Sequence, residues 1–135
     1  MTGPPRLLVH YDRPERFLDA IEDRFPDLDV RCCATYDALA DDLAAFAPEV
    51  VFTIKFENRP YPRDALLAAP SLRWVQVGGA GIDHLTPWDP ERLTVTNSAG
   101  VAADVMAQYA TAAILSLTLG LPRFMRAQVE HRWAP

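Results

Sequence analysis

Five short apolar runs recur along the first hundred residues, and a segment of different character follows each of them. The runs span residues 6–11, 28–33, 49–54, 72–77 and 93–96. Amphipathic helical patterns follow the first two runs, and a short helical segment over 63–69 follows the third. A strand that alternates with a helix usually rejoins its sheet by a right-handed crossover, parallel to its neighbour. The pattern therefore predicts an α/β fold with a parallel sheet flanked by helices.

Two of the intervening helices have recognisable starts and buried stripes. Residues 12–15 combine an aspartate, an early proline and an acidic first turn, which favour a helix start. Thr35 is a candidate cap for the second helix. Apolar residues at helical spacing predict the inner faces, which are Phe17, Leu18, Ile21 and Phe25 in the first helix and Tyr36, Leu39, Leu43 and Phe46 in the second.

Length and charge limit the class of protein. A chain of 135 residues suits one domain that buries roughly 68% of its unfolded surface. The net charge is −5 and the 13 basic residues are scattered, so we expect no nucleic-acid partner.

The adjacent Cys32 and Cys33 point to opposite faces of a strand and cannot easily form a disulfide. With an apolar N-terminal run too short for a signal peptide, a cytoplasmic protein is expected.

Residues 105–122 carry no charge, which raises the question of a membrane span. Gln108, Thr111, Ser116 and Thr118 dilute the apolar character of this segment. We therefore expect no membrane insertion, and predict a helix from about Val101 to Leu119 that is buried on nearly all sides in a soluble protein. Such burial requires protein on both sides of the helix.

The glycine pair Gly79 and Gly81 follows the fourth predicted strand, where a dinucleotide-binding turn would stand. That turn needs a third glycine three residues later and a helix start at the pyrophosphate. The third position is His84, and Pro87 prevents a long helix. What remains is a bend with few side chains, at which backbone N–H groups can approach a small anion.

Three features fall beyond the carboxyl ends of predicted strands, where parallel sheets bind ligands. They are Lys55 after the third strand, the 78–84 loop after the fourth, and Asn97 with Ser98 after the fifth. Lys55 is the only lysine of the chain. Its ammonium is a candidate for binding an acid, and an ordinary solvated loop lysine is the alternative.

The segments 72–85, 95–101 and 126–133, together with the uncharged helix, carry a specific resemblance. They resemble the N-terminal portion of D-isomer-specific 2-hydroxyacid dehydrogenases, nearest to the glyoxylate and hydroxypyruvate reductase branch. The resemblance implies a flavodoxin-like substrate domain over residues 1–100, followed over 101–135 by interdomain helices. It also implies an NAD or NADP cofactor and a small 2-oxo or 2-hydroxy acid as substrate.

The resemblance implies roles for individual residues. Gly79, Ala80 and Gly81 correspond to the loop whose backbone N–H groups bind the carboxylate of the acid. Met106 stands where the family contacts the cofactor, commonly through a threonine. Because methionine cannot donate a hydroxyl hydrogen bond, we interpret it more readily as a core residue than as a cofactor ligand.

Two other constellations in the sequence are interpreted as structural. Asp83 and His84 are adjacent, and adjacent side chains usually diverge, so we expect a turn aspartate and a partly exposed histidine. Ser98 lacks the glycine pattern of a hydrolase nucleophile. No catalytic residue and no metal site is predicted in these 135 residues.

The family's glycine-rich NAD-binding domain and its catalytic arginine, glutamate and histidine have no counterpart in the sequence. We therefore expect a fragment or one piece of a split enzyme, inactive as a dehydrogenase alone. The alternative is a small-acid-binding or interaction module without catalysis, which forms a homodimer through its long helix. A signalling receiver domain is a weaker third, because a single Asp12 follows the first strand and Lys55 replaces the phospho-acceptor aspartate.

Overall fold

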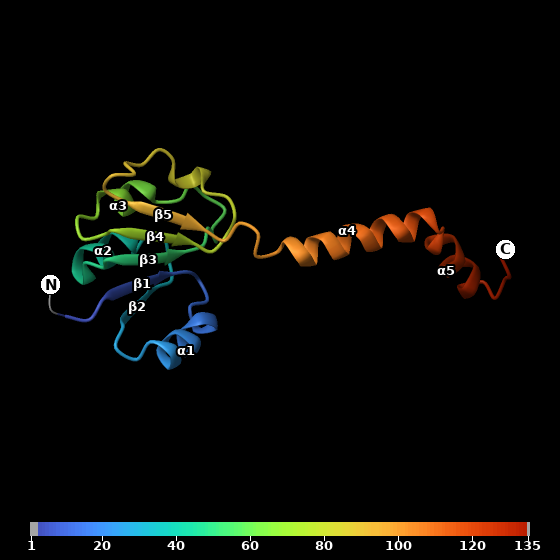
Figure 1. Ribbon diagram of the computed structural model, residues 1–135, viewed down its shortest axis with the longest axis horizontal. Coiled ribbons are helices and arrows are strands. Elements are labelled where there is room, and N and C mark those ends of the chain that lie inside the picture. Colours follow the sequence, from blue (N-terminus) through green and yellow to red (C-terminus); the bar gives the residue numbers. More distant parts are fainter. Residues whose placement is uncertain (1–2, 135) are drawn as a thin grey trace. The chain divides into compact units, whose positions relative to one another are not determined.

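The computed structural model describes residues 3–134, which fall into two compact units divided between Ala99 and Gly100. Within the described residues, the first unit holds one five-stranded parallel sheet in the order β2-β1-β3-β4-β5 (Figure 1). Its strands are β1 (Arg6–His10), β2 (Asp29–Cys33), β3 (Val50–Thr53), β4 (Trp74–Val77) and β5 (Thr94–Asn97). The predicted α/β fold with a parallel sheet is confirmed.

The strands are paired so that their carboxyl ends lie side by side. His10 of β1 pairs with Cys33 of β2 and with Thr53 of β3. Thr53 pairs with Val77 of β4, which pairs with Asn97 of β5. The last residues of all five described strands thus form a single row across the sheet. Every loop that leaves this row begins at the same edge, where ligands bind in folds of this class.

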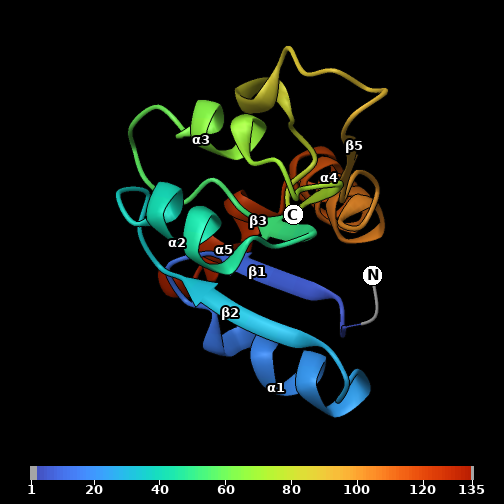
Figure 2. The same cartoon turned by 90° about the vertical axis from the view of Figure 1, so that its left-hand side faces the viewer.

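Helices cover both faces of the sheet (Figure 2). On one face lie α2 (Leu39–Phe46) and α3 (Arg63–Ala68), and on the other lies α1 (Glu15–Arg24). The buried side chains of α2 and α3 join one core cluster with those of alternate strand residues, which include Leu8, Val51, Val75 and Val77. On the opposite face, the Phe17 ring of α1 packs against Phe52 at a centroid distance of 5.2 Å. Side chains that alternate along each strand therefore serve two different helix layers.

The helical stripes agree with the prediction in α2 and differ in α1. Tyr36, Leu39, Leu43 and Phe46 are all buried, as predicted. The prediction of Thr35 as the cap was wrong, because α2 begins only at Leu39 and has no side-chain cap, although the Thr35 hydroxyl accepts a hydrogen bond from the Ala38 N–H. In α1, by contrast, no residue is fully buried. The prediction for Phe25 was wrong, because the helix ends at Arg24 and the Phe25 side chain is 55% exposed.

The second unit consists of α4 (Ala103–Thr118) and α5 (Leu121–Val129), joined through Gly120 with a left-handed φ of 68°. The expected helix is present, but its expected burial is not, since no residue of α4 is buried. Among residues 100–134 nothing surrounds the helix, so apolar composition alone did not determine its environment. Within residues 3–134 no single helix is long and apolar enough to cross a membrane, although α4 and α5 taken together, with a 66° bend, meet the length and composition criteria.

Candidate functional site

The loop that follows β4 is fastened at three points by backbone and side-chain hydrogen bonds. The Gly78 N–H donates to the Thr53 carbonyl of β3 at 2.8 Å. On the other side, the Ser98 N–H donates to the Gly79 carbonyl at 3.0 Å. The Asn97 side-chain amide donates to the Ala80 carbonyl at 2.8 Å. The ends of β3 and β5 therefore fix the path of the loop between them.

This fastening determines which way the backbone N–H groups face. In a planar trans peptide, a carbonyl and the following N–H point in opposite directions. The carbonyls of Gly79 and Ala80 point toward β5. The N–H groups of Ala80 and Gly81 consequently point away from β5. Within residues 3–134, the N–H groups of Gly79, Ala80 and Gly81 donate to no protein acceptor. We name these three residues the amide cradle.

The two glycines of the amide cradle are not required by the fold. Neither has a positive φ, and a Cβ added to Gly79 or to Gly81 would meet no protein atom within 4 Å. Gly78 differs, because its Cβ would lie 2.6 Å from Ile54 Cγ1 and 2.9 Å from Phe52 Cζ. Packing therefore explains the glycine at position 78, whereas open space surrounds the glycines at 79 and 81.

A hollow of about 360 Å³ lies beside the amide cradle. Its walls are formed by Ile54, Lys55, Val77, Gly79, Gly81, Asp83 and His84. The structure thus brings Lys55 together with two residues of the predicted acid-binding loop. Ala80 is exposed next to them. Within the described part of the chain, the Lys55 ammonium forms no ion pair.

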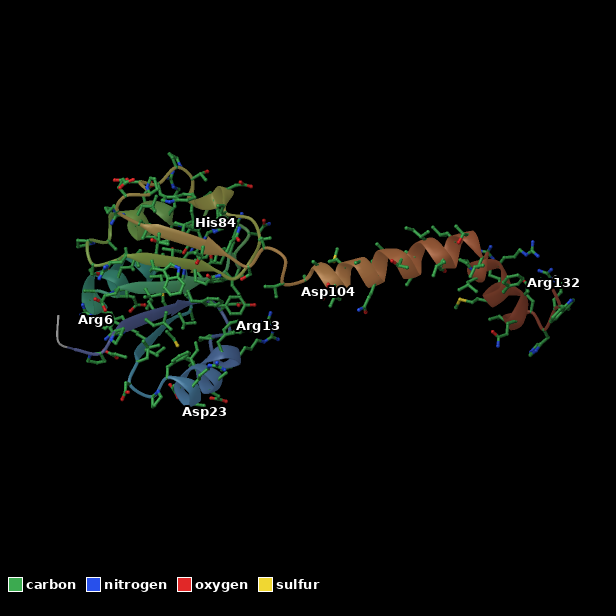
Figure 3. All side chains as sticks on the ribbon, viewed as in Figure 1. Arg6, Arg13, Asp23, His84, Asp104 and Arg132 are labelled. Atoms are coloured by element: carbon green, nitrogen blue, oxygen red, sulfur yellow. The ribbon has the colours of Figure 1, made fainter. Side chains whose placement is uncertain are left out.

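Asp83 is exposed in a turn and His84 is partly exposed, as expected from the sequence, and both line this hollow. They belong to the short 3₁₀ helix η1 (Asp83–Leu85), and His84 is labelled in the first unit in Figure 3. Burial lowers the pKa of His84, and the charge of Lys55 lowers it further, while Asp83 acts in the opposite direction. These effects together favour the neutral imidazole at His84.

A buried polar layer lies behind the hollow. His10 Nδ1 and the Tyr61 hydroxyl are 3.0 Å apart, and the Thr53 hydroxyl lies 3.0 Å from the Tyr61 hydroxyl and 3.3 Å from His10 Nδ1. His10 and Thr53 are fully buried. Burial lowers the pKa of His10 to about 4 and raises the pKa of Tyr61. The layer is therefore uncharged at neutral pH, and it supports His84 through the Tyr61 ring, whose centroid is 5.1 Å from the imidazole.

The loop that carries Lys55 is clamped by Tyr36. The Tyr36 hydroxyl accepts hydrogen bonds from the N–H groups of Phe56 at 3.2 Å and Glu57 at 3.4 Å. In return, the Glu57 carboxylate accepts the Tyr36 N–H at 2.9 Å. The Arg59 guanidinium pairs with Glu57 and with Asp37. Its hydrogen bond to the Glu57 carboxylate lowers the pKa of Glu57. The backbone that positions Lys55 is thus fixed by contacts to a neighbouring turn.

Met106 is exposed, contrary to its interpretation as a core residue, and no metal site was predicted from the sequence. Met106 belongs to α4 in the second unit, and its side chain is 62% exposed. Its contact with a cofactor stays a prediction. Among residues 3–134, no group of three or more histidine, cysteine or acidic side chains is arranged to hold a metal ion.

Comparisons with known proteins identify relatives in fold. No family model and no curated protein matches the chain. A D-isomer-specific 2-hydroxyacid dehydrogenase family protein from Aeromonas salmonicida superposes with a TM-score of 0.74 at 20% identity, over 98% of this chain and 41% of that protein. An NAD-dependent formate dehydrogenase from Staphylococcus aureus gives a TM-score of 0.58 at 16% identity, over 96% of this chain and 43% of that protein.

A response regulator receiver domain protein from Methanospirillum hungatei shares the fold less closely. Its TM-score is 0.51 at 14% identity, over 82% of this chain and 94% of that protein. At these identities the comparisons establish the fold alone. They confirm, at the level of the fold, the predicted resemblance to the substrate portion of 2-hydroxyacid dehydrogenases. The chain spans about two fifths of the length of the dehydrogenases that it matches.

Proposed function

We propose that this chain is the substrate-binding portion of an NAD(P)-dependent oxidoreductase that interconverts 2-oxo acids and D-2-hydroxy acids, such as glyoxylate or hydroxypyruvate. The observation that carries the proposal is the amide cradle, whose three successive N–H groups have no protein acceptor within the described residues. The fold of the structurally similar dehydrogenases supports the same assignment.

The amide cradle suits the carboxylate of such an acid. Backbone N–H groups bind an anion through dipoles and hydrogen bonds without introducing a side chain that would crowd it. Because the loop is already fastened to β3 and β5, little conformational freedom is lost when the acid binds. The cradle would bind and orient the carboxylate, while the nicotinamide would supply or accept the hydride.

The turn after β4 is not a dinucleotide-binding turn. The turn after β4 has His84 in place of a third glycine, and the short η1 replaces the long helix that a pyrophosphate requires. The 135 residues therefore account for acid binding, and we assign them no step of hydride transfer.

Thermal unfolding in the presence of small ligands tests the proposal. A ligand that binds only the folded state raises the melting temperature. We expect glycolate to raise the melting temperature of the chain more than its uncharged analogue glycolamide does, with chloride used to match the ionic strength. The Gly81→Val variant, whose side chain would fill the cradle, should lose this difference. Equal effects of glycolate and glycolamide on the unsubstituted chain would contradict a carboxylate site.

We expect the purified 135-residue polypeptide to show no dehydrogenase activity. Hydride transfer requires the donor and acceptor to be held together, and this chain lacks a dinucleotide turn. Oxidation of NADH or NADPH with glyoxylate or hydroxypyruvate, followed by absorbance, checks this. Turnover that exceeds a no-protein control and copurifies with the chain would show that the cofactor site has been overlooked.

A non-catalytic module that binds small acids and dimerises is the second candidate, and the exposed surface of α4 favours it. Large apolar side chains of α4 are uncovered within the second unit, among them Tyr109 and Leu117, each 73% exposed. Exposed apolar area of this kind promotes self-association. We expect light scattering to show a mass that rises with concentration, and Leu117→Glu to reduce it. A constant monomer mass over a wide concentration range would oppose the homodimer.

A signalling receiver function has the least support. The turn after β1 holds only Asp12 as an acidic residue, and Lys55 lies beyond β3, where a phospho-acceptor aspartate would be needed. The buried side chains of His10 and Tyr61 also contact each other near the ends of β1 and β3. The local chemistry therefore favours an acid-binding site over a phosphorylation site.

A further inference from the structure

A second hollow lies at the edge of the sheet where the strands begin, opposite to the edge of the amide cradle (Figure 1). Val50, Trp74 and Thr94 are the first residues of β3, β4 and β5, and strand register places them in one row. All three line this hollow, whose volume of about 630 Å³ is usual for a ligand site, at about 300–1,000 Å³. We name it the amino-edge hollow. It shares no lining residue with the hollow beside the amide cradle.

The backbone around the amino-edge hollow is closely connected. The Glu49 carbonyl accepts hydrogen bonds from the Arg73 N–H at 2.9 Å and from the Trp74 N–H at 3.2 Å. The Arg73 carbonyl in turn accepts the Thr94 N–H at 3.0 Å. The segments that form the wall are therefore held together before any ligand binds, so that little backbone freedom is lost on binding.

An aromatic ring forms part of the wall. The Trp74 indole N–H donates to the Thr96 hydroxyl of β5 at 2.7 Å, which fixes the ring against the neighbouring strand. Trp74 is nevertheless 42% exposed, and among residues 3–99 only Phe25 is another exposed large apolar residue. A fixed and exposed indole offers a surface on which a planar ring can pack more favourably than its buried area alone would give.

Four charged side chains line the amino-edge hollow, and three of them have no partner among residues 3–134. Glu49, Arg73 and Glu91 form no ion pair and no side-chain hydrogen bond in this part of the chain. Arg92 differs, because its guanidinium donates to two backbone carbonyls at the end of α3. Arg73 and the two carboxylates thus keep their hydrogen-bonding capacity for solvent or a ligand.

The charges of the amino-edge hollow favour a ligand that carries both signs. No oxygen of Glu49 or Glu91 lies within 4.0 Å of an Arg73 nitrogen, so the opposite charges stand apart. An anion alone would be attracted by the arginines and repelled by the carboxylates, and a cation alone would meet the reverse. A zwitterion avoids both repulsions, because its carboxylate can pair with the planar guanidinium of Arg73 while its ammonium pairs with a glutamate.

We propose that the amino-edge hollow binds an α-amino acid with an aromatic side chain. Arg73 binds the carboxylate, Glu49 or Glu91 binds the ammonium, and the aromatic ring packs on Trp74 beside Val50. This inference does not depend on the proposed function, because the two sites lie at opposite edges of the sheet and share no residue.

Four small molecules that differ by one group test the site. L-Phenylalanine carries all three groups, 3-phenylpropionate lacks the ammonium, 2-phenylethylamine lacks the carboxylate, and L-alanine lacks the ring. Dissociation constants are measured by amide-resolved NMR titration of the 135-residue chain, in which the indole N–H signal of Trp74 reports on the hollow. We expect L-phenylalanine to bind about three- to tenfold more tightly than each of the other three.

Two variants assign each charge of the ligand to its partner. Arg73→Gln should abolish the advantage of L-phenylalanine over 2-phenylethylamine and keep its advantage over 3-phenylpropionate. The double variant Glu49→Gln, Glu91→Gln should do the reverse. A general loss of structure would weaken all ligands alike and could not produce this exchange. Arg16→Gln is the matched control, because Arg16 is exposed on α1 and does not line the hollow. Gly81→Val should leave L-phenylalanine binding unchanged.

Each other outcome overturns a stated part of the proposal. Binding of L-phenylalanine that is lost in Gly81→Val and kept in Arg73→Gln would place it in the amide cradle and overturn the second site. Equal binding of L-phenylalanine, 3-phenylpropionate and 2-phenylethylamine would overturn a site for a zwitterion, and equal binding of L-alanine would overturn the role of the ring. Absence of saturable shifts at Trp74 and Thr94 would overturn the site altogether. Failure of glycolate to bind, while L-phenylalanine binds at Trp74, would contradict the proposed function alone.

Discussion

The free energy of unfolding of the first unit should fall by about 3 kcal/mol as the pH drops from 6.5 to about 4, because His10 is fully buried. Burial lowers the folded-state pKa of His10 to about 4, whereas the unfolded chain has the ordinary value of 6.5. Between these values the unfolded state binds a proton that the folded state does not. Stability is therefore complete above pH 6.5, declines as the pH falls, and levels off below about pH 4.

Urea unfolding at a series of pH values, compared between the chain and its His10→Leu variant, isolates this contribution. Glu57 and His84 also have lowered pKa values, so the unsubstituted chain loses further stability in acid. The difference between the two proteins removes these shared effects. His131→Asn, at an exposed histidine with a φ of 48°, should behave like the unsubstituted chain. An equal acid dependence in His10→Leu would show that His10 accepts its proton without cost.

Alanine substitutions at Gly78 and Gly81 should have opposite effects on stability and on acid binding. Gly78→Ala places a methyl group 2.6 Å from Ile54 Cγ1, and we expect a loss of about 1–3 kcal/mol of unfolding free energy. Gly81→Ala meets no protein atom within 4 Å and has no positive φ to preserve, so stability should change by less than about 1 kcal/mol. The new methyl group should nevertheless hinder the approach of an acid to the cradle.

Urea unfolding and glycolate titration of the same two variants make this comparison. Gly78→Ala should keep its acid affinity under conditions where it remains folded, and Gly81→Ala should lose affinity while it remains stable. Loss of stability in Gly81→Ala comparable to that in Gly78→Ala would mean that both glycines serve the fold. The argument for an acid-binding role of Gly81 would then fail.

The strand pattern predicted the sheet because short apolar runs alternate with helical segments, and all five runs became strands, including the largely exposed edge strand β5. Burial of individual helices was harder to predict. Phe25 fits the helical spacing of α1, but that helix ends one residue earlier. The apolar composition of α4 equally suits a covered or an uncovered helix, since composition does not specify what lies around it.

The sequence indicated residues of the candidate site only where the type of residue and its place after a strand were informative by themselves. Glycines at 79 and 81 and the lysine at 55 were recognisable because glycine exposes amides and a strand end places its loop at the ligand edge. The exposure of Asp83 and His84 agreed with the expectation, but their place in the wall of the hollow depends on the turn of η1. The alignment of His10 with Thr53, and with Tyr61 beside them, depends on strand register and on a loop contact that no local pattern encodes.

The most direct test of the account asks which backbone N–H groups respond to an acid. An amide-resolved NMR spectrum of the isotope-labelled chain is recorded while glycolate is added, with glycolamide as the uncharged control. The account predicts saturable shifts of the Gly79, Ala80 and Gly81 amide signals with glycolate, smaller shifts with glycolamide, and their loss in Gly81→Val. Absence of shifts at these three amides, or shifts centred at another edge of the sheet, would contradict the amide cradle as the acid-binding site.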